Sequence, residues 1–338
     1  MQKKLFIFLL FTAYNSTYCQ VGGESVYQFL NLISSPRQAA LGGKTITNYD
    51  YDVNQPLFNP ASINEEMDGR LSLNYANYLG DVSYGTAAYA YTYDKHINTF
   101  HAGVTYVNYG KFDGRNEFGE STGEFKGSEV ALSLGYAYNV PWTNLYLGAN
   151  AKFISSTLES YQSFGAAADI GAVYVDDEND INIALVARNF GTQISTYNGE
   201  REKLPFEVIA GISQELDNVP VRWHLTLENM QKWKVAFSNP ARSEQSIDGE
   251  PVEEKVSFLG NAFRHVIFGA EILPQKAISF RLSYNFRRAA ELKILEQRTF
   301  SGISAGFGIR FNKFRFDYSY SRYTLASNTS LFGLMINL

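Results

Sequence analysis

From residue 71 to the C-terminus, large apolar residues alternate with small or polar ones in fourteen separate segments. Successive side chains of a β-strand point to opposite faces of the sheet, so the alternation puts the large apolar side chains of each segment on one face. Each segment is about 9 to 12 residues long, the length that a tilted strand needs to cross a bilayer. We therefore predict an all-β fold, a fourteen-stranded antiparallel transmembrane β-barrel over residues 71–338. The predicted strands are 71–79, 82–93, 98–109, 128–139, 144–155, 164–175, 181–190, 206–215, 221–230, 265–273, 278–287, 303–311, 314–323 and 329–338.

The connections between these segments differ in length on the two sides of the predicted barrel. The short ones are 94–97, 140–144, 176–180, 216–220, 273–277 and 312–313. The other side carries the long segments 110–127, 196–205, 231–264 and 288–302, with short loops near Gly80 and Ser327. Outer-membrane barrels have short periplasmic turns and longer extracellular loops, whereas a soluble β-sandwich has no reason to sort its loops in this way. The pattern predicts a location in the bacterial outer membrane.

Charged residues in the predicted strands lie in the phase opposite the large apolar side chains. A cation that faces lipid at the bilayer midplane costs about 2–4 kcal/mol, so this face is predicted to line the lumen. We expect several of these charges to pair across the wall or with the N-terminal segment and to help seal the pore. A water-soluble sheet with one wet face would explain the phase but not the loop lengths. The residues are Lys152, Asp169, Arg188, Glu207, Arg222, Glu228, Glu271, Arg281, Arg310, Arg315 and Asp317.

The first 19 residues have the pattern of a secretory signal peptide. Lys3 and Lys4 precede an apolar run over 5–11, which is too short to span a bilayer. Cys19 is the only cysteine, and cleavage directly after it is favoured over lipid attachment because Tyr18 is large where lipoprotein processing requires a small residue. The mature chain is then predicted to have no disulfide and no cysteine-based metal site.

Residues 20–70 are predicted to form a plug, or hatch, inside the lumen. Fourteen strands enclose more space than wall side chains fill, so the barrel would leak without an occupant. In this segment Ser35 is predicted to cap a short helix with Pro36 at its first position and Gly42 at its end. A disordered periplasmic tail is the alternative, but the apolar content of "ESVYQFLNL" disfavours it.

The run "RQAALGGKTITNYDYDVNQPLFNPASI" resembles the N-terminal hatch of the FadL family of fourteen-stranded outer-membrane barrels. The turn that carries this resemblance is Asn59, Pro60 and Ala61. If the resemblance extends to function, the chain is a channel for hydrophobic small molecules.

Four longer stretches resemble, in order, the PorQ family of the bacterial type IX protein secretion system: "GGESVYQFLNL", "LSLNYANYLGDVSYG", "NYGKFDGRNEFGESTGEF" and "FGIRFNKFRFDYSYSRY". This narrower resemblance implies a non-enzymatic barrel that anchors a surface-exposed partner in a cell-surface attachment complex. The partner would resemble PorZ, with PorU and PorV in the same complex. The FadL-like channel remains the alternative.

Other motifs give no support for an enzyme or a cofactor site. The "GISAG" motif at 302–306 would need a strand-to-helix elbow around Ser304, but the alternation continues past it. The four histidines, His96, His101, His224 and His265, are scattered and are predicted to form hydrogen bonds. The acidic turn at 176–180 lacks the glycine and terminal glutamate of an EF-hand. A net charge of -5 argues against a nucleic-acid partner.

The long segment 231–264 carries four aromatic residues that are unusual for a solvated loop: Trp233, Phe237, Phe258 and Phe263. Aromatic side chains often anchor protein interfaces, so these residues are predicted to contact a partner. A loop that folds onto its own barrel rim would explain them equally well. Besides such a partner, outer-membrane lipid is predicted to surround the barrel.

Overall fold

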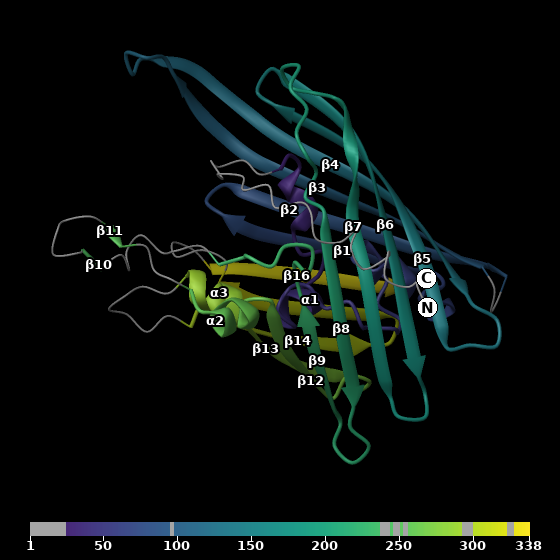
Figure 1. The fold of residues 1–338 in the computed structure, drawn as a ribbon. Coiled ribbons are helices and arrows are strands. Elements are labelled where there is room, and N and C mark those ends of the chain that lie inside the picture. Colours follow the sequence, from purple (N-terminus) through teal and green to yellow (C-terminus); the bar gives the residue numbers. More distant parts are fainter. Residues whose placement is uncertain are drawn as a thin grey trace, which may run out of the picture.

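Fourteen strands form a closed antiparallel barrel in the computed structural model (Figure 1). The structure describes residues 25–94, 98–236, 244–245, 251–252, 256–292, 300–322 and 328–338. The predicted signal peptide, residues 1–19, lies outside the described residues. The predicted architecture of the barrel is confirmed.

The barrel strands are β1 (Arg70–Leu79), β2 (Val82–Asp94), β3 (Asn98–Arg115), β4 (Ser121–Asn139), β5 (Leu145–Leu158), β6 (Tyr161–Asp176), β7 (Ile181–Ser195), β8 (Glu207–Glu215), β9 (Val221–Leu227), β12 (Val266–Ile272), β13 (Ile278–Asn285), β14 (Ile303–Phe311), β15 (Phe314–Arg322) and β16 (Asn328–Asn337). Each predicted strand corresponds to one of these. Neighbours in sequence pair with each other, and β12 pairs with β9 across the longest connection.

The last strand closes the barrel on the first. β16 pairs with β1 in an antiparallel register that places Leu71 opposite Ile336 and Leu73 opposite Leu334. The outward side chains Phe332 and Leu334 are exposed. Closure leaves no free sheet edge, which is the condition for strands that cross a membrane.

Side chains alternate between the two faces of the wall as the sequence predicts. On β13 the outward residues Phe280 and Leu282 are exposed, whereas Ser279, Arg281 and Ser283 are buried towards the lumen. Arg310, one of the charged residues predicted to line the lumen, is exposed because it lies at the end of β14. The outer surface of the wall is therefore apolar, as contact with lipid requires.

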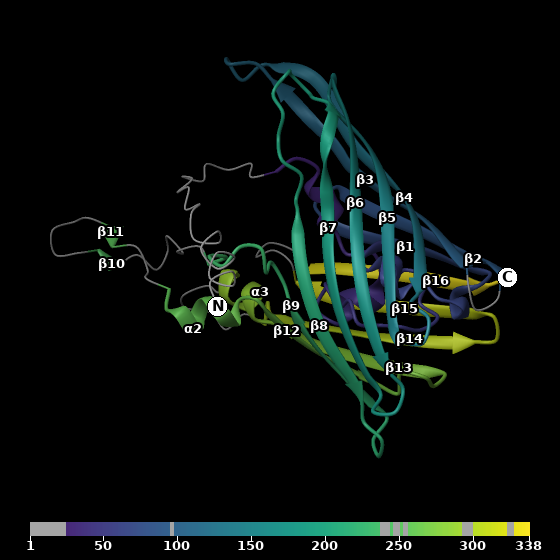
Figure 2. The same ribbon diagram turned by 45° about the vertical axis from the view of Figure 1, so that its right-hand side comes forward.

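Three of the predicted long loops contain regular structure. The sequence predicts a loop over 110–127, but β3 and β4 continue through most of it as a paired hairpin that projects past the neighbouring strands (Figure 2). The segment 231–264 contains the two-stranded sheet β10 (Glu244–Gln245) and β11 (Pro251–Val252) and the helix α2 (Phe258–Phe263). The helix α3 (Phe286–Glu291) follows β13. No helix in the described ranges is long and apolar enough to cross a membrane.

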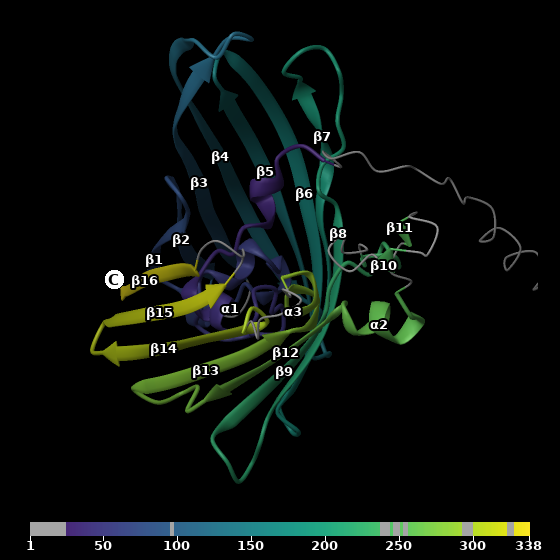
Figure 3. The same ribbon diagram turned by 90° about the vertical axis from the view of Figure 1, so that its left-hand side faces the viewer.

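Residues 25–69 run inside the ring of strands. They contain the short helix α1 (Pro36–Ala40) and four 3-10 helices, η2 (Gln28–Asn31), η3 (Gln55–Leu57), η4 (Pro60–Ser62) and η5 (Glu65–Met67). Figure 3 shows α1 within the outline of the ring. α1 contacts β13 to β16, and η4 contacts β4 to β6. We call these residues the N-terminal segment, and we call the two ends of the barrel the short-turn end and the long-loop end.

Candidate functional site: the N-terminal segment against the lumen wall

The helix α1 sets the direction of the N-terminal segment. The Ser35 hydroxyl accepts a hydrogen bond from the Gln38 amide at 3.3 Å, and Pro36 occupies the first position. At the other end, Gly42 has a φ of 96°, which favours glycine, and its amide donates to the Ala39 carbonyl. The predicted cap and end of this helix are confirmed.

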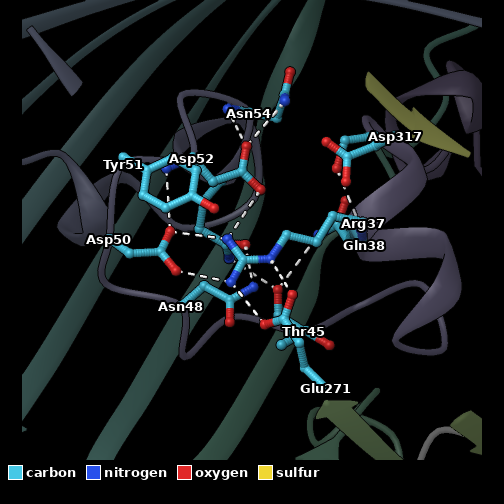
Figure 4. A network of polar contacts seen from close by, with 12 residues as sticks. Arg37, Gln38, Thr45, Asn48, Asp50, Tyr51, Asp52, Asn54, Glu271 and Asp317 are labelled. Atoms are coloured by element: carbon cyan, nitrogen blue, oxygen red, sulfur yellow. Dashed lines mark hydrogen bonds and ion pairs between the residues drawn. The ribbon is translucent and has the colours of Figure 1, made fainter. Parts of the chain in front are cut away.

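The Arg37 guanidinium of α1 lies at the centre of a buried charge network (Figure 4). It donates to both oxygens of Asp50 at 2.9 and 2.8 Å and to both oxygens of Glu271 on β12 at 3.2 and 2.8 Å. A carboxylate oxygen of Asp52 lies 3.5 Å away. A charge removed from water is costly unless it is paired, and Arg37 has three acidic partners.

The network continues along the lumen wall. Glu271 accepts from Arg281 of β13 at 2.6 Å, and Arg281 donates to Asp317 of β15 at 2.7 Å. Asp317 also accepts from Arg315 at 2.9 Å. The predicted pairing of lumen charges with one another and with the N-terminal segment is confirmed here, and one chain of ion pairs links α1 to three strands.

A second group of ion pairs holds the segment near the long-loop end. The Lys44 ammonium lies 2.5 Å from Glu207 of β8 and 2.9 Å from Glu228, which follows β9. The Arg188 guanidinium of β7 lies 3.7 Å from the centre of the Phe58 ring and donates to the Leu30 carbonyl at 3.1 Å. The segment is thus tied to β7, β8 and β9 as well as to β12.

Burial and neighbouring charges act in opposite directions on the ionisable groups of the segment. For Asp50, burial alone would raise the pKa of the carboxyl, but Arg37 and Arg222 outweigh it and hold that pKa well below its usual range. For Lys44, burial would lower the pKa, and Glu207 and Glu228 outweigh it and raise that pKa. Asp52 shows the reverse balance, because burial prevails over Arg37 and raises its pKa. Asp50 and Lys44 are therefore held in their charged forms.

The Asn59, Pro60, Ala61 turn packs against the opposite side of the lumen. The Asn59 side chain accepts from the Ala61 amide at 3.0 Å and donates to the Ile46 carbonyl at 2.8 Å. A Cβ at Gly148 of β5 would lie 2.3 Å from the backbone carbon of Pro60, and one at Gly171 of β6 would lie 2.2 Å from the Asn59 oxygen. Because these two glycines have no side chain, the turn can pack directly against the wall. The motif therefore positions the segment through steric fit.

The histidines and Ser304 have structural partners. His101 lies 2.9 Å from the Val53 carbonyl, and His224 lies 3.2 Å from the Thr47 hydroxyl. His265 lies 2.7 Å from the Glu228 carbonyl, which agrees with the predicted hydrogen-bonding roles, while His96 lies outside the described residues. Ser304 lies within β14 and accepts from Arg288 at 2.6 Å, so it is not on a strand-to-helix elbow. The described residues contain no group of His, Cys, Asp or Glu that could hold a metal ion.

The aromatic residues predicted to bind a partner lie at the long-loop end. The rings of Trp233 and Phe258 are 4.9 Å apart, and Trp233 also stacks on His265 at 5.5 Å. Phe263 packs instead on Phe286 of α3 at 5.6 Å. At least half of the surface of Trp233, Phe258 and Phe263 is exposed. Phe237 lies outside the described residues.

Cavities lie at both ends of the lumen. A cavity of about 200 Å³ at the long-loop end is lined by Leu32 and Ile33 of the segment, by Tyr78 and Tyr84 of the wall, and by polar and charged groups that include Lys44. Two cavities at the short-turn end measure about 320 and 240 Å³. Deeper in the lumen, the cavities beside Arg37 and beside Leu30 measure about 10 and 20 Å³, room for about one water molecule.

Sequence reasoning did not single out Arg37, Lys44, Asp50 and Asp52. Their signal was that all four are charged residues in a segment that was expected to be buried. A buried charge needs a partner, so each could have been matched with the lumen charges of the strands.

Two solved structures share this fold over almost their whole length. The monoaromatic hydrocarbon channel TodX, solved as a deltaS2 mutant, aligns with a TM-score of 0.53 at 13% identity and covers 91% of this chain and 98% of its own. A FadL homologue of Pseudomonas aeruginosa aligns with a TM-score of 0.51 at 11% identity and covers 94% and 100%. No protein-family model and no curated protein matches the sequence. The chain thus has the fold of these FadL-like barrels.

Proposed function

We propose that this chain is a non-enzymatic barrel of the bacterial outer membrane that passes hydrophobic small molecules, with the N-terminal segment as a movable plug. In this proposal the short-turn end faces the periplasm. The observation that carries it is the cavity of about 200 Å³ at the long-loop end, where Leu32, Ile33, Tyr78 and Tyr84 offer an apolar surface to an entering molecule. The fold shared with a hydrocarbon channel and a FadL homologue supports it.

Passage requires the N-terminal segment to move. The described cavities beside Arg37 and Leu30 are too small for an organic molecule. Ion pairs and hydrogen bonds fill the space between the segment and the wall, so a small molecule that leaves the outer cavity must displace part of the segment. A bond that fixes the segment to the wall should therefore stop passage.

A disulfide between Thr47→Cys and Gly211→Cys would provide this bond. A Cβ at Gly211 would lie 3.0 Å from the Thr47 methyl carbon, which is one bond away from the Thr47 Cβ. The two Cβ atoms are therefore within reach of a disulfide, which needs them about 4 Å apart. Cys19 is the only native cysteine and is predicted to leave with the signal peptide. In liposomes, the oxidised double variant should pass no hydrophobic fluorescent probe, and reduction should restore passage. Equal rates for the oxidised double variant and both single variants would contradict the proposal.

A second candidate function is the anchoring of a surface-exposed protein, and the exposed aromatic residues Trp233, Phe258 and Phe263 favour it. The partner would be a surface protein resembling PorZ, with PorU and PorV in the same type IX attachment complex. Exposed aromatic side chains of this kind are common anchors of protein interfaces.

Purification from the native membrane in mild detergent tests the anchoring function. A large surface protein should co-purify with the unchanged chain and be lost from the Trp233→Ala, Phe258→Ala double variant. Phe311→Ala is the matched control, because Phe311 is more exposed than either residue but lies at the short-turn end. If the same protein is recovered with the double variant and with the Phe311→Ala control, Trp233 and Phe258 do not form the interface.

A further inference from the structure

Cationic side chains converge on one cavity in the mouth of the lumen at the short-turn end. The cavity measures about 240 Å³ and is lined by Arg70 of β1, Arg310 of β14, Lys313 of the following turn and Arg315 of β15. The other lining residues are Tyr51, Asn312, Phe314, Met335 and Asn337. No carboxylate side chain is among them, although the whole chain has a net charge of -5.

Three guanidinium groups surround the Tyr51 ring of the N-terminal segment, which lies beside Asp50 and Asp52 in Figure 4. The guanidinium carbons of Arg70, Arg315 and Arg310 lie 4.9, 5.5 and 5.9 Å from the ring centre. Arg315 also donates to the Tyr51 hydroxyl. A ring can attract a cation at such distances, but it cannot offset the mutual repulsion of three cations.

Among the described residues, Arg315 is the only one of these four cations that forms an ion pair. It pairs with Asp317, which is shared with Arg281. Arg70 donates to the backbone carbonyl of Glu66, and Arg310 donates to the backbone carbonyl of Gln275 at 2.8 Å. Within the described part of the chain, Arg70, Arg310 and Lys313 form no ion pair. The Glu66 carboxylate lines the neighbouring cavity of about 320 Å³.

We propose that this cavity is a binding site for a phosphate-type anion, either free phosphate or the phosphate group of a small molecule. Three cations that form no ion pair with a described residue match a group that carries about -1.5 to -2 charge and three acceptor oxygens. Arginine is suited to phosphate because its planar group donates two parallel hydrogen bonds. A bound anion would join Arg70 of β1 to Arg310 of β14 and Lys313 beside the Tyr51 ring, and so stabilise this end of the barrel wall around the N-terminal segment.

Calorimetric titration of the folded full-length barrel in detergent tests this site, with sodium phosphate as the probe at constant ionic strength. Arg310→Gln and Lys313→Gln both change exposed side chains, so neither disturbs the buried network. Each should weaken phosphate binding at least about tenfold, because a hydrogen bond to a charged group is lost. Lys111→Gln, an exposed lysine of the β3–β4 hairpin, is the matched control and should bind as the unchanged chain does.

Two further arms separate the possible anions. A phosphorylated sugar should compete with free phosphate, whereas acetate at the same concentration should not. The proposal is overturned if the unchanged chain gives no heat with phosphate, if both glutamine variants bind as tightly as the control, or if acetate competes equally well. None of these results depends on whether the barrel passes hydrophobic molecules.

Discussion

The N-terminal segment is held on two sides of the lumen by contacts of different kinds. Towards β12, β13 and β15 the contacts are charged, with Arg37 bound to Glu271 and the chain of ion pairs continuing to Asp317. Towards β5 and β6 the contacts are neutral. There the Asn150 amide donates to the Pro56 carbonyl at 2.7 Å, and the Asn59 turn lies against Gly148 and Gly171.

The two sides should respond to different changes. Removing one partner of a buried ion pair strongly lowers the free energy of unfolding, because the other charge stays buried without compensation. A close backbone contact depends instead on the volume of the residues that face it. The charged side is therefore sensitive to single charges and to pH, and the packed side is sensitive to added carbon atoms.

The largest effect is expected from Glu271→Gln on the charged side. This change leaves Arg37 and Arg281 short of one acidic partner each, and we expect a loss of about 3 kcal/mol in the free energy of unfolding. Denaturant unfolding measures the loss. Trypsin gives a second readout, since cleavage after Arg37 or Lys44 reports release of the segment.

Glu124→Gln is the control for a lost carboxylate. Glu124 pairs with Lys111 on the exposed β3–β4 hairpin, where an ion pair contributes less than about 1 kcal/mol. If the two variants unfold at the same denaturant concentration, the charge network does not hold the segment.

On the packed side, Gly148→Leu is expected to have an intermediate effect. The new side chain would collide with the backbone of Pro60, and overpacking of this kind costs about 1–3 kcal/mol. Trypsin should again reach the segment, although every charge is still present. Ala149→Leu is the matched control, because Ala149 is the next residue of β5 and is exposed on the outer face of the wall. If the segment of Gly148→Leu stays protected from trypsin, the Asn59 turn can shift without release of the segment from the wall.

The barrel could be predicted because its signal is local. On β13, Phe280 and Leu282 alternate with Ser279 and Arg281, and this period of two is independent of any distant residue. The β3–β4 extension was missed because the pairs from Lys111 with Lys126 to Gly114 with Gly123 contain charges and glycines in place of apolar alternation. The helices α2 and α3 have six residues each, too few for a helical period to appear.

The site could be predicted only in part. The Ser35 cap and the Asn59 turn are formed by neighbours in sequence, so their residues were recognisable. The contact of Arg37 with Glu271 joins residues 234 positions apart, and it depends on the path that the segment takes through the ring. No local pattern specifies that path, so lumen charges could be expected to pair, but their partners could not be named.

The smallest effect is expected from pH, and it should appear on the charged side alone. The Asp50 pKa is lower in the folded chain than in the unfolded one. The contribution of Asp50 to the free energy of unfolding is therefore complete above its unfolded pKa and is lost as pH falls through its folded pKa. Asp52 has the opposite sign, because its raised pKa favours the protonated form in the folded chain, and this makes the net change small. The protection of the amides around Arg37 against hydrogen exchange, corrected for the intrinsic rate at each pH, should fall below about pH 4, near the ordinary pKa of aspartate. Amides of the Asn59 turn should keep their protection, and Asp50→Asn should abolish the Arg37 response. An equal loss of protection around Arg37 and around Asn59 would mean that the segment leaves the wall as one unit, and the two sides would then differ in chemistry but not in behaviour.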